Sequence, residues 1–299
     1  MSPADDVLLV DASIYIFRAY FSMPDHWQSD EGFGTGAVYG YGQFLLNLIE
    51  QTGASHLACC YDESLTHCFR NQLYPAYKAN RELPDEALAF QLRACRELSQ
   101  LLGIPSHASP VYEADDLIGA LMQRAHCELA EQRVAVVTRD KDLGQLLARE
   151  QDYLWNFADQ EQLFAEQIVS KFGVRPEQLV DYLALVGDKI DNIPGVPGVG
   201  AKTAAVMLQH YASIEALFAN LPALVNLPVR GAKSLATKLE QHLEQIALAK
   251  MLATIVTDIP FDEGVDPLQR QSADLPELRK FCEAMGFPRL MTRLERLLG

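Results

Sequence analysis

Three short apolar runs predict strands that are buried on both faces. They are VLLV at 7–10, LACCY at 57–61 and VAVVT at 134–138. Short, nearly continuous apolar runs are typical of the inner strands of a parallel sheet, because both faces of such a sheet are covered by helices.

Amphipathic helices are predicted between these strands. Apolar positions recur at the spacing of a helix over 37–51, 85–102 and 114–130. The second of these segments begins at a Pro-Asp pair and ends at Gly103, which are common start and stop signals. Strands that alternate with helices predict the α/β class, with a doubly wound parallel sheet.

From about Pro176 the pattern changes to helices and turns. Helices are expected over 176–186, 201–210, 213–219, 232–253 and 275–297. A Gly- and Pro-dense segment, GDKIDNIPGVPGVG, separates the first two. We therefore expect two parts, an α/β core over 1–175 and a helical region over 176–299.

Composition places the chain among ordinary globular proteins. It has 299 residues, of which 49% are hydrophobic and 22% are charged. No apolar run has the length of a membrane span, and MSPADDVLLV lacks the apolar stretch of a signal peptide. The six cysteines form no CxxC pair, which indicates reduced thiols and a cytoplasmic protein.

The net charge of −15 argues at first against a nucleic-acid partner, because phosphate backbones require positive surface. That objection weakens if the carboxylates are clustered and neutralised by metal ions. The distribution of the acids therefore matters more than their sum.

Each predicted strand is followed at once by aspartate. Asp11 and Asp62 follow the first two strands, and the third runs into RDKD, which contains Asp140 and Asp142. Ligands of open parallel sheets bind outside the carboxyl ends of the strands. These four carboxylates are therefore expected to share one rim.

Two further acidic segments are expected beside that rim. YEADD supplies Glu113, Asp115 and Asp116 at the start of a predicted helix, and GDKID supplies Asp188 and Asp191. Acids in a first turn can simply cap free N–H groups. So many neighbouring carboxylates would raise one another's pKa values, however, which favours a site for Mg²⁺ or Mn²⁺. Two such ions about 4 Å apart would suit phosphodiester hydrolysis.

The segment GVPGVGAKT predicts a phosphate contact. Gly195, Gly198 and Gly200 precede a helix that Lys202 and Thr203 open. Glycines allow close approach of a phosphate, and a helix N-terminus offers N–H donors to it. A purely structural turn is the alternative, but this glycine pattern between two helices is typical of a helix–hairpin–helix that binds DNA backbone.

One stretch, SLTHCFRNQLYPAYKANR, contains no acid. Its cations are Arg70, Lys78 and Arg81, and Tyr74 and Tyr77 lie among them. Cations interleaved with aromatic rings are typical of a path for single-stranded nucleic acid, although a solvated loop would also fit. Lys78 and Arg81 are three residues apart, so on a helix they would share one face.

These segments together resemble the 5′ nuclease (flap endonuclease) family, and most closely the N-terminal 5′→3′ exonuclease domain of bacterial DNA polymerase I. The resemblance is colinear over nearly the whole chain. It is carried by LLVDASIYIFRAYF, YDESLTHCFR, YKANR, YEADD, TRDKDLGQLL and GDKIDNIPGVPGVGAKTA. It implies a PIN-like nuclease core with a helical arch at about 64–90, and a DNA-binding helical region.

The resemblance also implies a function and its residues. The activity would be 5′→3′ exonuclease and flap endonuclease hydrolysis of DNA with two or more Mg²⁺ (or Mn²⁺) ions, and with K⁺ at the hairpin. The implied metal ligands are Asp11, Asp62, Glu113, Asp115, Asp116, Asp140, Asp142, Asp188 and Asp191. The implied catalytic cations are Arg70, Lys78 and Arg81, and the implied DNA contacts are Arg18, Tyr77, Gly195, Gly198, Gly200, Lys202 and Thr203.

The expected partners follow from the same resemblance. They are DNA with 5′ flaps, nicks or ends and a separate DNA polymerase, because no polymerase region follows; the chain is expected to be a monomer without membrane attachment. Ala12, Arg139 and Lys189 depart from the family pattern and bear on metal affinity and substrate preference. A metal-dependent ribonuclease and an inactive DNA-structure-binding protein are the alternatives. The DNA-type hairpin argues against the first, and the complete carboxylate set against the second.

Overall fold

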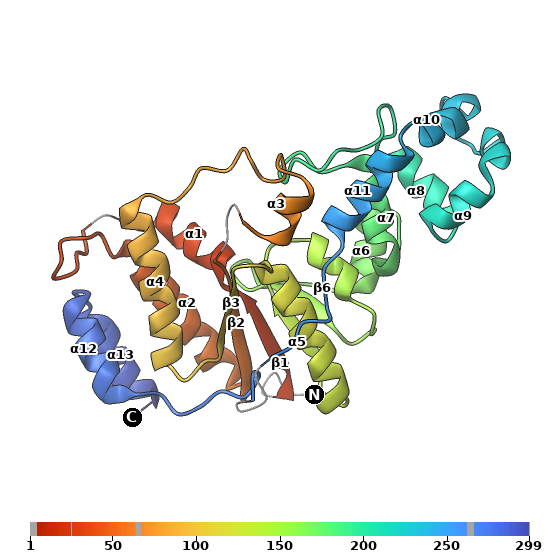
Figure 1. Ribbon diagram of the computed structural model, residues 1–299. Helices are drawn as coiled ribbons and strands as arrows, with labels where there is room; N and C mark the ends of the chain where they lie inside the picture. Colours follow the sequence, from red (N-terminus) through yellow and green to blue (C-terminus); the bar gives the residue numbers. More distant parts are fainter. Residues whose placement is uncertain (1–4, 25, 64–66, 262–265, 299) are drawn as a thin grey trace.

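The computed structural model describes residues 5–24, 26–63, 67–261 and 266–298. The described residues form a sheet with the strand order β3-β2-β1-β4-β5-β6 (Figure 1). Strands β1 to β5 are parallel, and β6 is antiparallel to β5. The strands are β1 Val7–Asp11, β2 His56–Asp62, β3 Ser106–Ser109, β4 Val134–Val137, β5 Tyr153–Asn156 and β6 Glu161–Leu163.

Helices cover both faces of the sheet, as the α/β prediction requires (Figure 1). They are α1 Ala12–Ser22, α2 Gly36–Thr52, α3 Phe69–Leu73, α4 Glu86–Leu101, α5 Ala114–Glu128, α6 Ala165–Phe172, α7 Leu179–Val186, α8 Ala201–His210, α9 Ile214–Ala219, α10 Leu235–Gln241, α11 Leu243–Ala253, α12 Leu275–Ala284 and α13 Pro288–Leu298. Short 3₁₀ helices include η2 Asp142–Leu146 and η3 Pro176–Gln178.

Strand β1 shows why the apolar runs predicted buried strands. Leu8 and Val10 pack with α1, α2 and α4 on one face, while Val7 and Leu9 pack with α5 and α7 on the other. Successive side chains of a strand point to opposite faces, so a strand covered on both sides must be apolar throughout. The predicted α/β class is confirmed.

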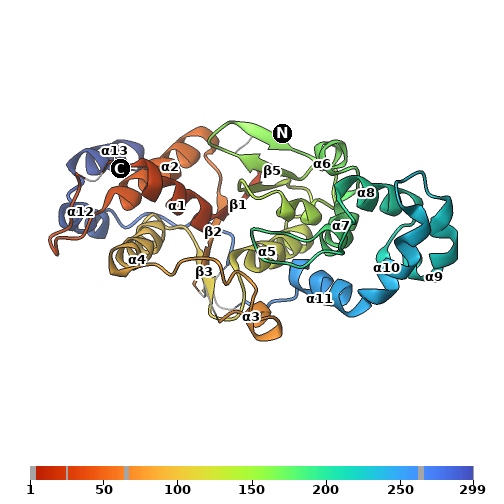
Figure 2. The ribbon, with the colours of Figure 1, turned by 90° about the horizontal axis from the view of Figure 1, so that it is seen from above.

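The C-terminal helices do not all extend away from the sheet. Helices α8, α9 and α10 lie at one end of the molecule, whereas α12 and α13 return and pack against α4 and α2 (Figure 2). The single helix predicted over 275–297 is also wrong, because Gly286 interrupts it with φ +76°. The helix predicted over 232–253 is likewise divided, into η5 Ala232–Ser234, α10 and α11.

The predicted helical arch differs in the described residues. Residues 64–66 lie outside them, and from Tyr74 to Asp85 the chain forms turns and extended backbone rather than a helix. Lys78 has φ 51°, which is left-handed backbone. The expectation that Lys78 and Arg81 share a helix face is therefore wrong, because that conformation interrupts a right-handed helix.

Two simpler expectations can be compared directly with the structure. The cysteines are free thiols, all buried except Cys127. Within the described segments, we find no helix with the length and apolar character needed to cross a bilayer.

Gly195 is required by a close approach of two backbones. A Cβ at this position would lie 2.1 Å from the carbonyl oxygen of Val186 at the end of α7. At Gly200, by contrast, a Cβ would have no neighbour within 4 Å. The backbone oxygen of Gly195 also accepts a hydrogen bond of 2.6 Å from Gln245.

We therefore predict that Gly195→Ala lowers the free energy of unfolding by at least about 2 kcal/mol, because a backbone segment must move to admit the methyl group. Gly200→Ala is the matched control and should cost about 1 kcal/mol or less, the scale of a changed helix cap. Urea denaturation of both variants measures the difference. Equal losses would show that the contact with Val186 does not restrict position 195.

Candidate active site

The strand ends bring aspartates to one edge of the sheet. Asp11 ends β1, Asp62 ends β2, and Asp140 follows β4. Strand β1 lies between β2 and β4, and the three are parallel. The carboxyl ends of these strands therefore open on the same rim, as the sequence predicted.

Asp11 is the most enclosed acid of the rim, with a relative exposure of 3%. Burial, together with the negative charge of Asp62 and Asp140, raises its pKa to about 8. Its Oδ2 accepts a hydrogen bond of 2.9 Å from the hydroxyl of Thr138, which favours the charged form only in part. Asp11 is therefore a carboxylate that lacks a compensating positive charge.

The acids of the RDKD segment repel their neighbours in the same way. Burial raises the pKa of Asp142 to about 7, and the charges of Asp140, Asp188 and Asp191 add to that shift. The pKa of Asp140 is also raised, first by burial. The loop GDKID thus lies close enough to the rim to act on it electrostatically.

The three acids of YEADD have different surroundings. Asp115 is half-buried, and its pKa is raised well above the ordinary value by burial and then by Asp140 and Asp11. Asp115 is therefore the member of the segment that belongs to the carboxylate cluster.

Asp116 faces away from that cluster and is fully buried. Its Oδ1 accepts hydrogen bonds from Arg70 at 2.7 Å and from the Val256 amide at 2.8 Å. Its Oδ2 accepts from Arg70 at 2.6 Å and from the Glu113 amide at 3.1 Å. A carboxylate has about four lone-pair sites, so none remains for a metal ion. Asp116 could therefore bind a metal ion only by exchanging these partners, so its assignment as a ligand stays a prediction, while helix capping explains part of its role.

Glu113 is neutralised by protein groups. Its Oε1 lies 2.6 Å from the ammonium of Lys78, and its Oε2 accepts hydrogen bonds from Arg70 at 2.8 Å and Tyr77 at 2.9 Å. Burial disfavours its charge, but Lys78 and Arg70 outweigh burial and lower its pKa. Glu113 could reach a metal ion only by exchanging these partners.

Arg70 and Tyr77 are buried and paired with other protein groups. Arg70 is 3% exposed, and its guanidinium is used by Glu113, Asp116 and the carbonyl oxygens of Leu252 and Thr254. Tyr77 is also 3% exposed, and its hydroxyl donates to Glu113. Neither side chain can contact a substrate phosphate or DNA without leaving these partners, so the contacts favour structural positions and the predicted roles stay predictions.

Lys78 and Arg81 converge on the second acidic loop. The ammonium of Lys78 lies 3.5 Å from Asp191 Oδ2, and the guanidinium of Arg81 lies 2.6 Å from Asp191 Oδ1. Backbone contacts join the same segments, since the Lys78 amide donates to the Asp191 carbonyl at 3.1 Å. Two cations therefore stand at the rim, and Arg81 is exposed enough to turn toward a ligand.

The hairpin residues surround the start of α8. Gly198 has φ +78°, Gly200 caps the helix, and Lys202 and Thr203 lie in its first turn. The sequence interpretation missed Lys238 of α10, whose ammonium would lie 2.8 Å from a Cβ at Gly198. This lysine lies in the segment RGAKSLATKLEQ, residues 230–241, and only the fold brings it to the hairpin.

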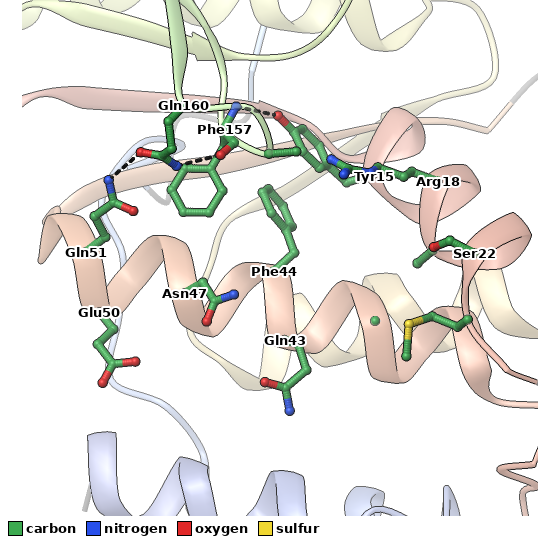
Figure 3. Close-up of a pocket in the computed structure, with 14 residues that line it drawn as sticks. Tyr15, Arg18, Ser22, Gln43, Phe44, Asn47, Glu50, Gln51, Phe157 and Gln160 are labelled. Carbon is green, nitrogen blue, oxygen red and sulfur yellow. Dashed lines mark hydrogen bonds between the residues drawn. The ribbon is translucent and has the colours of Figure 1, made fainter.

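Arg18 lines a cavity whose lining includes none of the acids of the rim. The side chain is exposed, and this cavity of about 570 Å³ lies between α1, α2 and the turn after β5 (Figure 3). The rings of Tyr15 and Phe44 stack in this cavity with centroids 3.9 Å apart. A second cavity of about 660 Å³ does adjoin the rim, because Asp62 and Arg81 line it together with the aromatic residues Phe17, Tyr20 and Phe21.

The chemistry of the donors fits a hard cation. Asp11, Asp115, Asp140 and Asp142 supply only oxygen atoms, and the raised pKa values of all four indicate uncompensated negative charge. In the described part of the chain, no three His, Cys, Asp or Glu side chains already form a compact metal-binding group.

Comparison with known proteins gives two family matches. Residues 6–173 match the model of the 5′-3′ exonuclease N-terminal resolvase-like domain, and residues 174–276 match that of the 5′-3′ exonuclease C-terminal SAM fold. The chain is 40% identical over 263 residues to DNA polymerase I of Pseudomonas aeruginosa. The aligned region covers 88% of this chain and 28% of that protein. It spans about a third of the length of the curated relatives that it matches.

Solved structures share the fold. The T5 D15 protein, co-crystallised with metal ions, is similar with a TM-score of 0.65 and 20% identity over 98% of both chains. The catalytic core of Rad2 in complex with a DNA substrate gives a TM-score of 0.63 and 16% identity over 98% of this chain and 91% of that core.

The raised pKa of Asp115 predicts that the ionised side chain lowers the folding stability of the metal-free protein at high pH. Because the folded state binds this proton more tightly than the unfolded state, stability falls as pH rises above about 4, the unfolded value, toward the higher folded value. Asp115→Asn removes the ionisation. It should raise the melting temperature by a few degrees at about pH 8 and leave it nearly unchanged at about pH 4.

Calorimetry in EDTA measures this effect. The exposed Asp258 provides the control, because Asp258→Asn should give no comparable pH-dependent gain. A gain for Asp115→Asn that is the same at both pH values, or a loss at the higher one, would contradict the electrostatic account.

Proposed function

The chain belongs to the 5′-3′ exonuclease family, and on that premise we propose that it hydrolyses phosphodiester bonds near the 5′ ends and flaps of DNA with a divalent cation, Mg²⁺ or Mn²⁺. The observation that carries the proposal is the set of uncompensated carboxylates at one rim, beside two cations and a helix–hairpin–helix. The products would be short 5′ fragments.

The acids divide into ligands for two or more ions. Asp11, Asp62 and Asp115 would hold one ion, while Asp142, Asp188 and Asp191 would hold another, with Asp140 shared between them. A bound divalent ion supplies charge neutralisation, activation of an attacking water and stabilisation of the leaving oxygen. Their mutual repulsion explains why these acids would need a cation to come together.

Lys78 and Arg81 would act on the phosphate itself. In the free protein both side chains pair with Asp191, so two cations lie at the rim and each has a carboxylate partner. Glu113 would hold Lys78 in place through the 2.6 Å contact. Fixed cations next to a reacting phosphate stabilise the negative charge that builds up in the transition state. We propose catalytic roles for these two residues and a structural role for Arg70.

The hairpin would bind the duplex away from the reacting phosphate. Gly198 and Gly200 leave the backbone accessible, and the start of α8 with Lys202 and Thr203 offers N–H groups and a positive charge. Lys238 would add a second cation at Gly198. Local positive charge of this kind allows DNA binding despite the net charge of −15. A K⁺ ion at the hairpin stays a prediction.

Other features of the assignment also remain proposals. They include the division at 175/176, a monomeric state and a separate DNA polymerase as partner. Arg18 is kept as a proposed DNA contact, since it is exposed beside a cavity.

The principal prediction is that cleavage and binding can be separated. Asp115→Asn removes a proposed ligand and one negative charge, so single-turnover cleavage of a labelled 5′-flap DNA in Mg²⁺ should fall by at least about 100-fold. Affinity for the same DNA in Ca²⁺, which permits binding with little turnover, should be unchanged or higher because repulsion of phosphate decreases. Asp258→Asn serves again as the control and should leave both quantities unchanged.

Near-normal cleavage by Asp115→Asn would refute its role as a ligand. A wild-type protein that binds flap DNA tightly but does not cleave it with any divalent ion would favour the inactive binding protein. Cleavage of RNA alone would favour the ribonuclease.

A further inference from the structure

The segment Leu252–Val256, which comprises the last two residues of α11 and the three that follow, is bound from both sides by polar side chains. Each of its five residues uses a backbone N–H or C=O group for such a bond. The segment is thus joined to the neighbouring elements by bonds between side chains and its backbone, not by backbone pairing.

One side of the segment contacts α3 and α5. Arg70 donates to the carbonyl oxygens of Leu252 at 2.8 Å and Thr254 at 2.7 Å. The amide of Val256 donates to Asp116 at 2.8 Å. Asp116 lies next to Asp115, so this side of the segment is fixed to the helix that carries one part of the carboxylate cluster.

The other side contacts η2 through one residue, Gln145. Its amide nitrogen donates to the carbonyl oxygen of Ala253 at 3.1 Å and to that of Asp142 at 3.1 Å. Its amide oxygen accepts from the Ile255 amide at 3.1 Å. Gln145 therefore joins the segment to the residue that begins η2 and carries the other part of the cluster.

The contacts alternate along the chain. Residues 252, 254 and 256 bind Arg70 and Asp116, whereas residues 253 and 255 bind Gln145. The chain leaves α11 in extended conformation at Thr254, with φ −73° and ψ 125°. From Thr254 the chain is extended, and successive residues of an extended chain direct their backbone groups to opposite sides. Together with the free carbonyl groups of Leu252 and Ala253 at the end of α11, this allows one segment to contact two elements at once.

We infer that Gln145 is a positioning residue for the carboxylate site. Through Leu252–Val256 it fixes η2, and with it Asp142, relative to α5 and Asp115. The inference rests on the proposed function, because the arrangement would hold two groups of metal-binding acids at a defined separation. Side chains that orient metal ligands in this way affect metal affinity or activity by about 10–100-fold.

Gln178 offers a matched comparison within the same chain. Its amide nitrogen donates to the carbonyl oxygens of Leu208 at 2.6 Å and Ala212 at 3.1 Å, and its amide oxygen accepts from the Arg175 amide at 3.2 Å. Like Gln145, this side chain forms three hydrogen bonds to backbone groups, but its partners hold η3 against the end of α8 and carry no acid of the cluster.

The test replaces each glutamine with methionine, which has a similar length and no amide, in the full chain. Two quantities are measured against Mg²⁺ concentration: the single-turnover rate on a 5′-flap DNA and the melting temperature without DNA. For Gln145→Met we expect the Mg²⁺ midpoint of both to rise by about 10-fold. Affinity for DNA in Ca²⁺ should stay within about twofold, because no proposed DNA contact is removed.

Gln178→Met should lower the melting temperature in EDTA without moving either Mg²⁺ midpoint. A wild-type midpoint in Gln145→Met, or equal shifts in both variants, would overturn the inference while leaving the proposed function intact. If the wild-type protein shows neither cleavage nor stabilisation by Mg²⁺, the proposed function fails and the inference fails with it. Gln145→Asn keeps the amide on a shorter side chain, and the same criteria apply to it if Gln145→Met does not fold.

Discussion

Carboxylates that meet at the end of a buried parallel sheet repel one another, and the structure around them depends on how that repulsion is compensated. Burial and neighbouring acids raise the pKa of Asp11 to about 8 and that of Asp142 to about 7. A sheet covered on both faces leaves its strand ends as the natural place for polar groups, and each of β1, β2 and β4 contributes an aspartate there. The repulsion between these carboxylates is compensated in two different ways.

Protein cations compensate the acids at the periphery. Arg70 is shared by Glu113 and Asp116, and Lys78 and Arg81 meet at Asp191. Breaking such a buried pair would leave an uncompensated charge, so these contacts also hold α3, α5 and the GDKID loop together. Among the described residues, we find no cation paired directly with the acids in the centre, which are Asp11, Asp115, Asp140 and Asp142. The charge of Lys78 lowers the pKa values of Asp115, Asp140 and Asp142 only in part. We propose that divalent cations compensate this central group.

The sequence predicted the parts of the fold that follow from burial. The inner strands β1, β2 and β4 were predicted from their apolar runs, and α2, α4 and α5 from apolar periodicity. The inner strand β5 was not predicted, and the polar edge strand β3, with the sequence SHAS, carries no such signal. The neighbours Asp115 and Asp116 could not be distinguished, because their different roles depend on Arg70, which is 46 residues from Asp116 along the chain. Gln145 was not found for a similar reason, since its partners at Ala253 and Ile255 are backbone groups 108 and 110 residues away.

The rim would carry negative charge that a bound divalent cation relieves. This claim can be tested most directly through the melting temperature of the DNA-free protein at about pH 8, close to the raised pKa of Asp11, in MgCl₂ and in NaCl of equal ionic strength. The account predicts that Mg²⁺ stabilises the protein well beyond the effect of NaCl, with saturation as the site fills. Equal melting temperatures in the two salts over the whole range would contradict it.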